Sequence, residues 1–432
     1  MSPTFTSLEV RNYRVWATGA LVSNIGTWMG RVGQDWLVLT VLTAGSATAL
    51  GVVTGLQFLP FLVLAPWAGL IADRFSKRRI LLITQTLLAL TSLLLGVLAI
   101  TGTAQLWHVY AIALFQGVAT AIDNPARQAF VSEMVPPDKL ANAVALNSAS
   151  FNTGRLVGPG VAGLVIAAWG TGEALLLNTL TFVFVIVALL RLRTSELRPA
   201  PRVKGRGGIR EGFTYVKHRR DIQLVMVLVF VLGTFGMNFQ ITMALMATKV
   251  FDKGASEFGL LGSIMAIGSL TAALMSARRN VPRLRVLLIS LVGFTGASAL
   301  TAAAPTYWLF AIALVPVGLT ALTALTTANA MVQTRVAPEM RGRVMALYMA
   351  IFMGGTPVGA PLIGWISEQF GPRWTIGIGS VAVGLSLIGV SIWLGRSENV
   401  RVSYESQRRP RVRVSTAPVL DGPTMPVPEP AR

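Results

Sequence analysis

The sequence predicts an all-α membrane protein with about twelve transmembrane helices, arranged as two six-helix bundles. Its 432 residues are 53% hydrophobic and only 13% charged, whereas roughly a quarter of the residues in a soluble domain are charged. Its apolar stretches are long enough to cross a hydrocarbon core, which takes about 20 helical residues. The second half of the chain also repeats features of the first, and this predicts a duplicated bundle.

The predicted helices are separated by short connections that carry most of the charges. The first bundle is expected to contain helices at about 16–42, 47–71, 79–101, 106–123, 140–168 and 174–192. The second is expected to contain helices at about 221–249, 257–277, 285–303, 306–331, 343–367 and 373–395. Pro125 and Pro136 are expected to break the helical structure after the fourth helix, because proline removes a backbone donor. The start is polar up to Arg14 without a secretory cleavage pattern, so the first helix is expected to stay as an anchor.

The segment between the bundles and the C-terminal segment differ in composition from the helices, because both are rich in proline and arginine. The expected domains are two bundles at 1–192 and 221–395, a cytoplasmic linker at 193–220 and a disordered cytoplasmic tail at 396–432. Within the linker, Ile209, Phe213 and Val216 fall at helical spacing, which predicts a short helix on the membrane surface.

The net charge of +19 is distributed as in a membrane protein rather than a nucleic-acid-binding one. With the N-terminus placed in the cytoplasm, nearly every Lys and Arg falls on the cytoplasmic side. The exceptions are Lys249, Lys253 and Arg373 outside, and Arg31 and Arg155 within helices. This bias follows the positive-inside rule. It predicts a multi-pass protein of the cell membrane with both termini in the cytoplasm.

The two halves match at a constant offset, and many of the matched positions are glycines. The glycine pairs in the fifth and eleventh helices are Gly154 and Gly355, Gly158 and Gly359, Gly163 and Gly364, and Gly170 and Gly371. Six helices in each half return the chain to the same side, so the repeats are expected to be parallel. Such repeats occur in secondary transporters, where the substrate site lies between the halves near the midplane.

The connection between the second and third helices carries the first motif. It contains Gly69, Asp73, Arg74, Lys77 and Arg78. The glycine permits two helices to approach closely, and Asp73 is suited to hold the positive N-terminus of a helix in the other half. Two interpretations remain open: an ordinary positively charged loop, or a cytoplasmic gate.

The fifth helix carries the second motif. Gly154, Gly158 and Gly163, with Pro159, give it a smooth face and a site for a kink. This face is either a tight helix interface without a special role or part of the transport machinery.

A third stretch joins the fourth and fifth helices on the expected cytoplasmic side. It holds Asp123, Arg127 and Glu133. These charged residues are expected to take part in the same gate as the first motif.

These motifs together resemble a known family. The first is similar to the loop signature of the major facilitator superfamily, although Ser76 stands where that family usually has glycine. The second resembles the fifth-helix signature of proton-coupled exporters. The third, with Gln34-Asp35-Trp36-Leu37, resembles the enterobactin-exporter-like drug efflux subfamily. The resemblance covers most of the chain and implies the two-bundle fold and export, but no particular cargo.

Charged residues inside the predicted helices give the sharpest local signal, because an isolated charge at the bilayer centre costs about 2.5–3.5 kcal/mol. Arg31 and Asp35 lie one turn apart on the first helix and are expected to pair, and Arg155 lies on the fifth helix. Further polar candidates are Asn24, Gln34, Asn152, Asn238 and Gln240. Two interpretations remain open. Either these groups only hold the helices together, or Asp35 accepts the transported proton. In the second case, Arg31 and Arg155 adjust the proton affinity of Asp35 or bind an anionic part of the substrate. An apolar cavity is expected from Trp28, Trp36, Phe58, Trp67, Phe115, Phe235, Phe239 and Phe352.

The resemblance implies a proton-driven exporter of small amphipathic molecules, such as drugs or secreted metabolites, working by alternating access. The alternatives are an importer or facilitator on the same fold and a non-transporting membrane sensor. The expected partners are a small-molecule substrate and membrane lipids, without nucleic acid, and the protein is expected to act as a monomer. No phosphate-binding Gly-Lys-Ser/Thr loop is present, which argues against ATP. With no cysteine and two distant histidines, His108 and His218, no metal site is expected. The sequence contains no nucleophile–base constellation, so no enzyme activity is expected. No cofactor is expected, and the proton gradient is the expected energy source.

Overall fold

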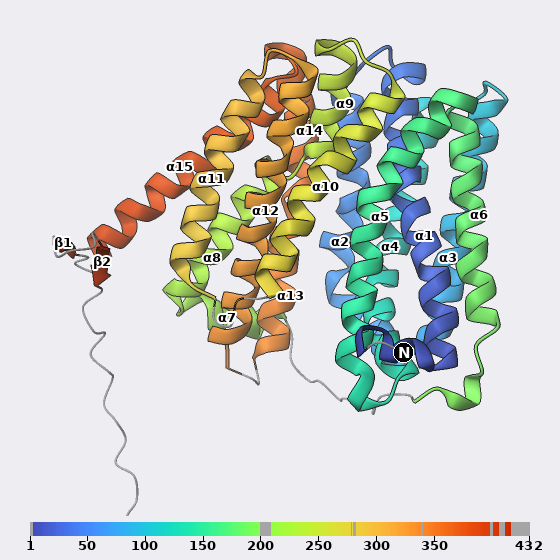
Figure 1. The fold of residues 1–432 in the computed structure, drawn as a ribbon, viewed down its shortest axis with the longest axis horizontal. Helices are drawn as coiled ribbons and strands as arrows, with labels where there is room; N and C mark the ends of the chain where they lie inside the picture. The colour runs from blue at the N-terminus through green and yellow to red at the C-terminus, as the bar shows by residue number, and fades with distance from the viewer. Residues whose placement is uncertain are drawn as a thin grey trace, which may run out of the picture. The chain divides into compact units, whose positions relative to one another are not determined.

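A computed structural model describes residues 3–198, 209–277, 279, 282–337, 340–397, 401–405 and 411–415 (Figure 1). The chain forms two compact units, Met1–Gly384 and Leu385–Arg432. The first unit holds both helical halves, and the boundary with the second falls within the last helix.

The first half consists of six long helices. They are α1 (Arg11–Trp36), which continues as π-helix over Leu37–Leu42, α2 (Ala47–Arg74), α3 (Lys77–Ile100), α4 (Leu106–Met134), α5 (Leu140–Trp169) and α6 (Thr171–Leu190). Helix α1 packs against both α5 and α6, and α2 packs against α4.

The second half begins with a short helix in the expected linker position, α7 (Ile209–Lys217). The next helical segment is α8 (Arg220–Val231), π-helix over Leu232–Gly236, α9 (Phe239–Leu245) and π-helix over Met246–Val250. The remaining helices are α10 (Ala255–Ala277), α11 (Leu284–Ala303), α12 (Tyr307–Arg335), α13 (Arg341–Gly354), α14 (Thr356–Phe370) and α15 (Trp374–Ser397).

Nine helical segments of the described residues are long and apolar enough to cross a membrane. The other long helices, α1, α4 and α5, have 26, 29 and 30 residues and more polar groups. We call the end of the first unit where α2 meets α3 and α4 meets α5 the basic end, because Lys77 and Lys139 lie there. The opposite end, where α1 meets α2 and α9 leads into α10, is called the far end.

Pro125 does not break the helical structure, so that prediction is wrong. It lies inside α4, which continues to Met134. A proline inside a helix costs about 3 kcal/mol. Asp123, Ala126 and Phe130 of the same helix are buried, and tertiary packing of this kind contributes most of the stability of a helix in a folded protein.

Two predicted helices, 221–249 and 343–367, are interrupted rather than continuous. The first breaks between Gly236 and Phe239, where the side-chain amide of Asn238 donates to the Thr234 carbonyl at 2.8 Å. That carbonyl would otherwise accept a backbone hydrogen bond within the helix. The second breaks at Gly355, two residues before Pro357, which has no backbone donor.

The second unit contains two short strands where no regular structure was expected. Strands β1 (Arg401–Glu405) and β2 (Arg411–Ser415) pair in antiparallel register, with Val402 opposite Val414. Valine or tyrosine at every second position of both segments favours extended backbone. The other residues of the predicted tail after Ser397, and residues 199–208 of the predicted linker, lie outside the described residues.

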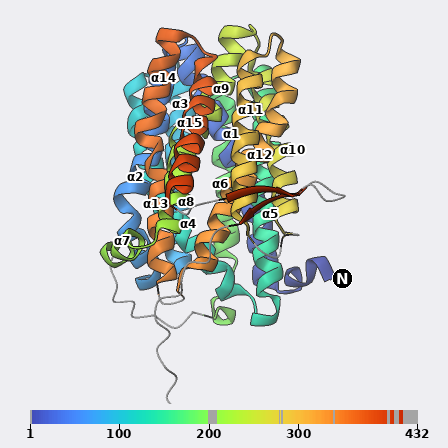
Figure 2. The same ribbon diagram turned by 90° about the vertical axis from the view of Figure 1, so that its left-hand side faces the viewer.

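The most extensive contacts between the two halves of the first unit are made by two helix pairs. Helix α10 packs on α5 (Figure 1), and α14 packs on α2 (Figure 2). The repeat is also visible in the turns of the chain, because Gly170 and Gly371 end α5 and α14 with positive φ values of 114° and 97°. Only glycine adopts this conformation without strain.

Candidate functional site

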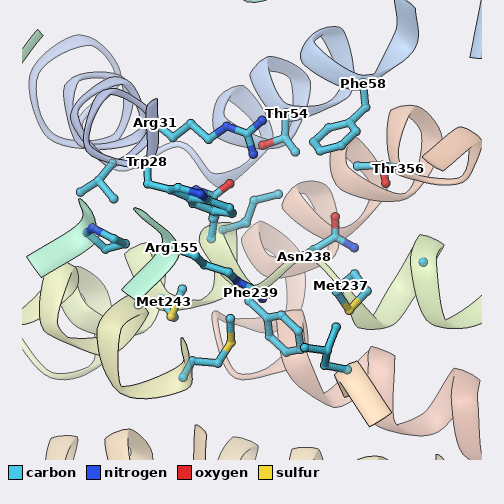
Figure 3. Close-up of a pocket in the computed structure, with 18 of the residues that line it drawn as sticks. Trp28, Arg31, Thr54, Phe58, Arg155, Met237, Asn238, Phe239, Met243 and Thr356 are labelled. Carbon is cyan, nitrogen blue, oxygen red and sulfur yellow. The ribbon is translucent and has the colours of Figure 1, made fainter. Parts of the chain in front are cut away.

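A cavity of about 330 Å³ lies between the two halves (Figure 3). The first half contributes residues of α1, α2 and α5, and the second contributes residues between Gly233 and Met243 and from α10, α12 and the α13–α14 region. Its size is at the lower end for sites that enclose a drug-sized ligand, roughly 300–1,000 Å³. The break around Asn238 gives the cavity part of its wall.

Two arginines from different helices line the cavity. The guanidinium carbons of Arg31 on α1 and Arg155 on α5 lie 5.2 and 5.8 Å from the centre of the Trp28 ring. Arg31 also lies 6.0 Å from the Phe58 ring centre. Both distances to Trp28 are within the range of cation–π attraction. The structure thus brings together two of the predicted charges.

The predicted ion pair between Arg31 and Asp35 is not formed as a direct contact, because the Arg31 side chain is turned to the aromatic rings of the cavity instead. Asp35 is 5% exposed, and within the described part of the chain its Oδ2 has no hydrogen-bond partner. Gln34 is likewise buried, with an unpartnered Nε2 among the described residues. Neither Asp35 nor Gln34 lines the cavity.

The other polar candidates divide into two groups. Asn238 and Gln240 line the cavity. Asn24 does not, because its amide donates to Ser150 Oγ at 2.9 Å and so joins α1 to α5. Asn152 donates to the Ser148 carbonyl one turn earlier on its own helix.

The aromatic prediction is correct for half of its residues. Trp28, Phe58, Phe239 and Phe352 line the cavity. Trp36 instead stacks on Phe258 of the other half, with ring centres 6.0 Å apart. Trp67 and Phe115 are 54% and 66% exposed, as expected for side chains that face lipid. Phe235 is not in the lining either.

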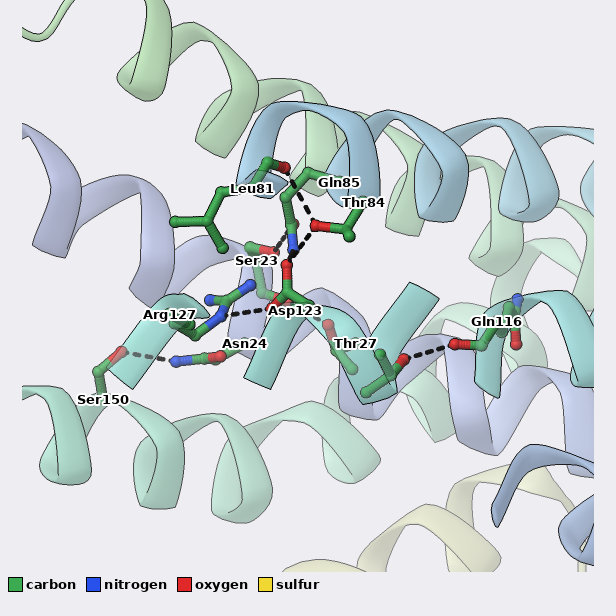
Figure 4. A network of polar contacts seen from close by, with 11 residues as sticks. Ser23, Asn24, Thr27, Leu81, Thr84, Gln85, Gln116, Asp123, Arg127 and Ser150 are labelled. Carbon is green, nitrogen blue, oxygen red and sulfur yellow. Dashed lines mark hydrogen bonds and ion pairs between the residues drawn. The ribbon is translucent and has the colours of Figure 1, made fainter. Parts of the chain in front are cut away.

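Asp123 and Arg127 do not lie in a connecting loop but inside α4, within the first half (Figure 4). The Asp123 carboxylate accepts hydrogen bonds from Thr84 Oγ1 at 2.7 Å, Gln85 Nε2 at 2.8 Å and Arg127 Nε at 2.9 Å. The Arg127 guanidinium carbon lies 5.5 Å from the ring centre of Trp16 on α1. This buried cluster therefore ties together α1, α3 and α4.

Truncating Asp123 to alanine is expected to destabilise the protein by about 3–5 kcal/mol, because it leaves Arg127 buried without its counterion. Thermal unfolding in detergent would measure this as a lower melting temperature. Asp138 is exposed between α4 and α5, so Asp138→Ala is the matched control and should change the melting temperature little. Equal melting temperatures for the two variants would show that Asp123 is not needed as the counterion of Arg127.

The remaining residues of the predicted gate lie at the basic end. Lys77 pairs with Glu133 at 3.0 Å, joining α3 to the end of α4, and Arg78 Nε donates to the Leu189 carbonyl at 2.8 Å. Arg74 is exposed at the end of α2. The ion pair and the hydrogen bond stay within the first half and do not bridge to the second.

Like Arg74, the two other residues of the loop motif, Gly69 and Asp73, lie in α2 itself. An added Cβ at Gly69 would meet no atom within 4 Å, so the close helix approach expected there is not made. Asp73 lies in the last turn of α2, and its side chain is outside the described part of the structure.

The glycines of α5 contact two different helices. A Cβ on Gly154 would lie 2.8 Å from the Asn24 carbonyl oxygen, and one on Gly158 would lie 2.7 Å from that of Ile25, both on α1. On Gly163 it would lie 2.6 Å from the carbonyl oxygen of Ala255 at the start of α10. The intervening Pro159 packs against Gly262 of α10. The motif thus holds α5 against its own bundle and against the other half.

The matching glycines of the second half make the equivalent contacts. Gly355 and Gly359 approach Thr234 in the segment after α8, and Gly364 approaches Ala47 and Thr48 at the start of α2. Each half therefore presents one glycine-rich helix to the other, which is the arrangement expected from duplication.

Glu368 makes a second kind of contact between the halves, which no motif in the sequence indicates. From α14 this carboxylate accepts hydrogen bonds from Ser46 Oγ at 2.7 Å, Thr48 N at 3.0 Å and Thr48 Oγ1 at 2.7 Å. These groups form the N-terminus of α2, where a negative charge is favourable. The contact joins residues that are far apart in the sequence, so local patterns could not have found it.

Replacing Glu368 by alanine is expected to lower the free energy that keeps the far end closed by about 1 kcal/mol. This is roughly a fivefold change in the ratio of closed to open molecules. The chain has no cysteine, so Thr54→Cys provides a single reporter in the cavity lining. Its reaction with an impermeant maleimide added at the far end should be faster in the Glu368→Ala background. Glu173→Ala, at an exposed position at the same end, is the control. Unchanged labelling would show that the contact does not hold this end closed.

Comparison with known proteins gives a consistent result. The sequence family described as "Transmembrane secretion effector" matches residues 2–418. The staphyloferrin A transporter of Staphylococcus aureus is 26% identical over 372 residues, covering 85% of this chain and 91% of that protein. Macrolide efflux protein A of Streptococcus pyogenes is 22% identical over 395 residues, covering 89% and 96%.

Among solved structures, a mutant form of the nucleoside transporter NupG superposes with a TM-score of 0.70. It is 14% identical in sequence, and the match covers 88% of this chain and 98% of NupG. At this identity the likeness shows the fold alone, and it confirms the predicted fold class.

Proposed function

The chain belongs to the transmembrane secretion effector family of the major facilitator superfamily, and we therefore propose that it is a secondary active exporter of small amphipathic molecules, such as drugs or secreted metabolites. It is a multi-pass membrane transporter and not an enzyme. The observation that carries the proposal is the cavity lined by both halves of the duplicated bundle. A site of this kind can be exposed to either side in turn by rocking of the halves.

The name of one compared protein supports the outward direction, because macrolide efflux protein A is named for efflux. The other is named for transport of staphyloferrin A, a small molecule, without a direction. The cavity of this chain has a mainly apolar and aromatic wall with a few polar groups, which suits amphipathic cargo.

The proposed cycle uses the contacts between the halves. With both termini in the cytoplasm, the far end is extracellular, and the α2–α14 and α5–α10 contacts close that side. In the opposite state, with the cavity open to the outside, the α2–α14 and α5–α10 contacts are broken and the basic ends of the two halves touch each other. The charged residues from Asp73 to Arg78 are then available to the proposed cytoplasmic gate.

The proposed energy source is the proton gradient, with Asp35 as the proton acceptor. Its carboxylate is buried one turn along α1 from Arg31, and one oxygen has no partner in the described structure. A buried carboxylate can change between charged and neutral states as its surroundings change. The protein would work as a monomer, since each chain has its own cavity lined by both halves.

Transport assays in oriented proteoliposomes test the proposal. In a panel that includes radiolabelled staphyloferrin A and a radiolabelled macrolide, at least one compound should move from the cytoplasmic to the extracellular face when a pH gradient is imposed, and a protonophore should stop this movement. Gradient-independent movement in both directions would identify a facilitator, and gradient-driven movement toward the cytoplasmic face would identify an importer. Neither binding nor movement of a broad compound panel would favour a sensor.

A further inference from the structure

The cavity has two positive charges at one of its walls. Arg31 and Arg155 reach it from α1 and α5, and both guanidinium groups lie against the same ring, Trp28 (Figure 3). An aromatic face attracts a cation but does not neutralise it. Two like charges held at one indole therefore favour binding of a negative group beside them.

The described residues that line the cavity do not supply that negative group, because they include neither aspartate nor glutamate. The ion pairs formed by the described residues involve other arginines and lysines. Asp35 attracts Arg31 electrostatically from outside the lining, but a single carboxylate cannot balance two guanidinium groups. Both arginines are only partly exposed to solvent. Uncompensated charge in such a position is unfavourable, and a bound anion would relieve it.

A second unsatisfied group reaches the cavity from the other half. Asn238 is 6% exposed, and its amide nitrogen donates to the Thr234 carbonyl. Its Oδ1 has no partner among the described residues, although the residue lines the cavity. This oxygen can accept a hydrogen bond from a hydroxyl or N–H group of a ligand.

The rest of the wall is apolar and adaptable. Met237, Met243, Met265 and Met353 surround the cavity on the side of the second half, together with Phe239. Methionine side chains adjust to ligands of different shapes. The ligand that fits these three features has an anionic end, an apolar body and a hydrogen-bond donor.

We infer that the cavity binds amphipathic organic carboxylates, with Arg31 and Arg155 holding the carboxylate and Asn238 accepting a hydrogen bond from a donor on the apolar body. This inference rests on the proposed function and specifies its substrate class. Guanidinium groups suit a planar carboxylate because they can donate two parallel hydrogen bonds to it. Neutral and cationic amphiphiles lack this contact and are disfavoured.

Calorimetric titration of the full-length protein in nanodiscs tests the inference with matched probes. The probes are 6-hydroxy-2-naphthoate, its neutral carboxamide and the corresponding hydroxynaphthylmethylammonium ion of similar size. The carboxylate should bind about tenfold or more tightly than the carboxamide, and the cation should bind weakest.

Single variants then locate the effect. Arg31→Gln and Arg155→Gln should each remove most of the preference for the carboxylate. A melting temperature close to that of the unaltered protein would show that each variant is folded. Arg155→Lys should restore part of the preference, because it keeps the charge without the planar donor pair. Lys249→Gln removes an exposed positive charge at the far end and is the matched control. Its preference should equal that of the unaltered protein.

Equal affinity for acid and amide, or a preference that survives both arginine variants, would overturn the inference. The proposed export activity can fail independently. If neutral or cationic probes are exported and the arginine variants do not matter, the protein is an exporter and the carboxylate site is wrong. If the carboxylate binds through the arginines but does not cross liposomes, the site is correct and the export proposal is wrong.

Discussion

Replacing Asp35 by asparagine is expected to abolish proton-driven substrate accumulation while leaving downhill exchange of substrate in place. Asparagine has nearly the same shape as aspartate but cannot bind and release a proton. Because Asp35 is outside the cavity lining, substrate contacts should change little. The variant should therefore carry substrate down its own gradient without responding to a pH gradient.

Proteoliposomes with an internal pH dye measure both fluxes in one preparation. Glu173→Gln, at an exposed position at the start of α6, is the control for removal of a carboxylate and should couple normally. If Asp35→Asn still moves protons with substrate at the normal ratio, Asp35 is not the proton carrier. Loss of both downhill exchange and accumulation would instead point to a structural role for this carboxylate.

Replacing Gly259 by valine is expected to prevent the far end from closing. Gly259 lies in the first turns of α10, where an added Cβ would overlap the carbonyl oxygen of Pro159 in the other half and lie 3.0 Å from the backbone of Gly163. Backbone atoms cannot move aside without separating α5 from α10. Overpacking of this kind costs about 1–3 kcal/mol, which shifts a conformational ratio by roughly 5- to 150-fold.

The strain exists only while the halves touch, so the variant can relieve it by opening the far end. Substrate export should therefore fall by about tenfold or more, with little change in melting temperature. Labelling of the Thr54→Cys reporter from the far end should become faster in the same variant. Gly296→Val is the control, because no atom lies within 4 Å of the Cβ position at that glycine in α11. Normal export by Gly259→Val would mean that this contact is not part of the transport cycle.

The two expected results depend on different kinds of information. The prediction for Asp35 follows from the sequence, since an acid inside a long apolar helix is costly and therefore usually functional. The prediction for Gly259 does not, because it depends on the atoms that an added Cβ would meet, which differ between Gly259 and Gly296. What differs is the neighbouring helix, and that is set by the packing of one half on the other.

Hydrophobic length and periodicity act locally along the chain, so the helical membrane fold, the duplication and the short linker helix could all be predicted from the amino-acid sequence. Local patterns also singled out Arg31, Arg155, Asn238 and Gln240, which line the cavity. They could not predict which charged groups face each other. Helical spacing places Arg31 and Asp35 on the same face, yet the Arg31 side chain is long enough to turn to Trp28 instead. This choice, the burial of Asp123 and the contact of Glu368 with α2 emerge only when the helices pack, because each depends on a partner from another helix.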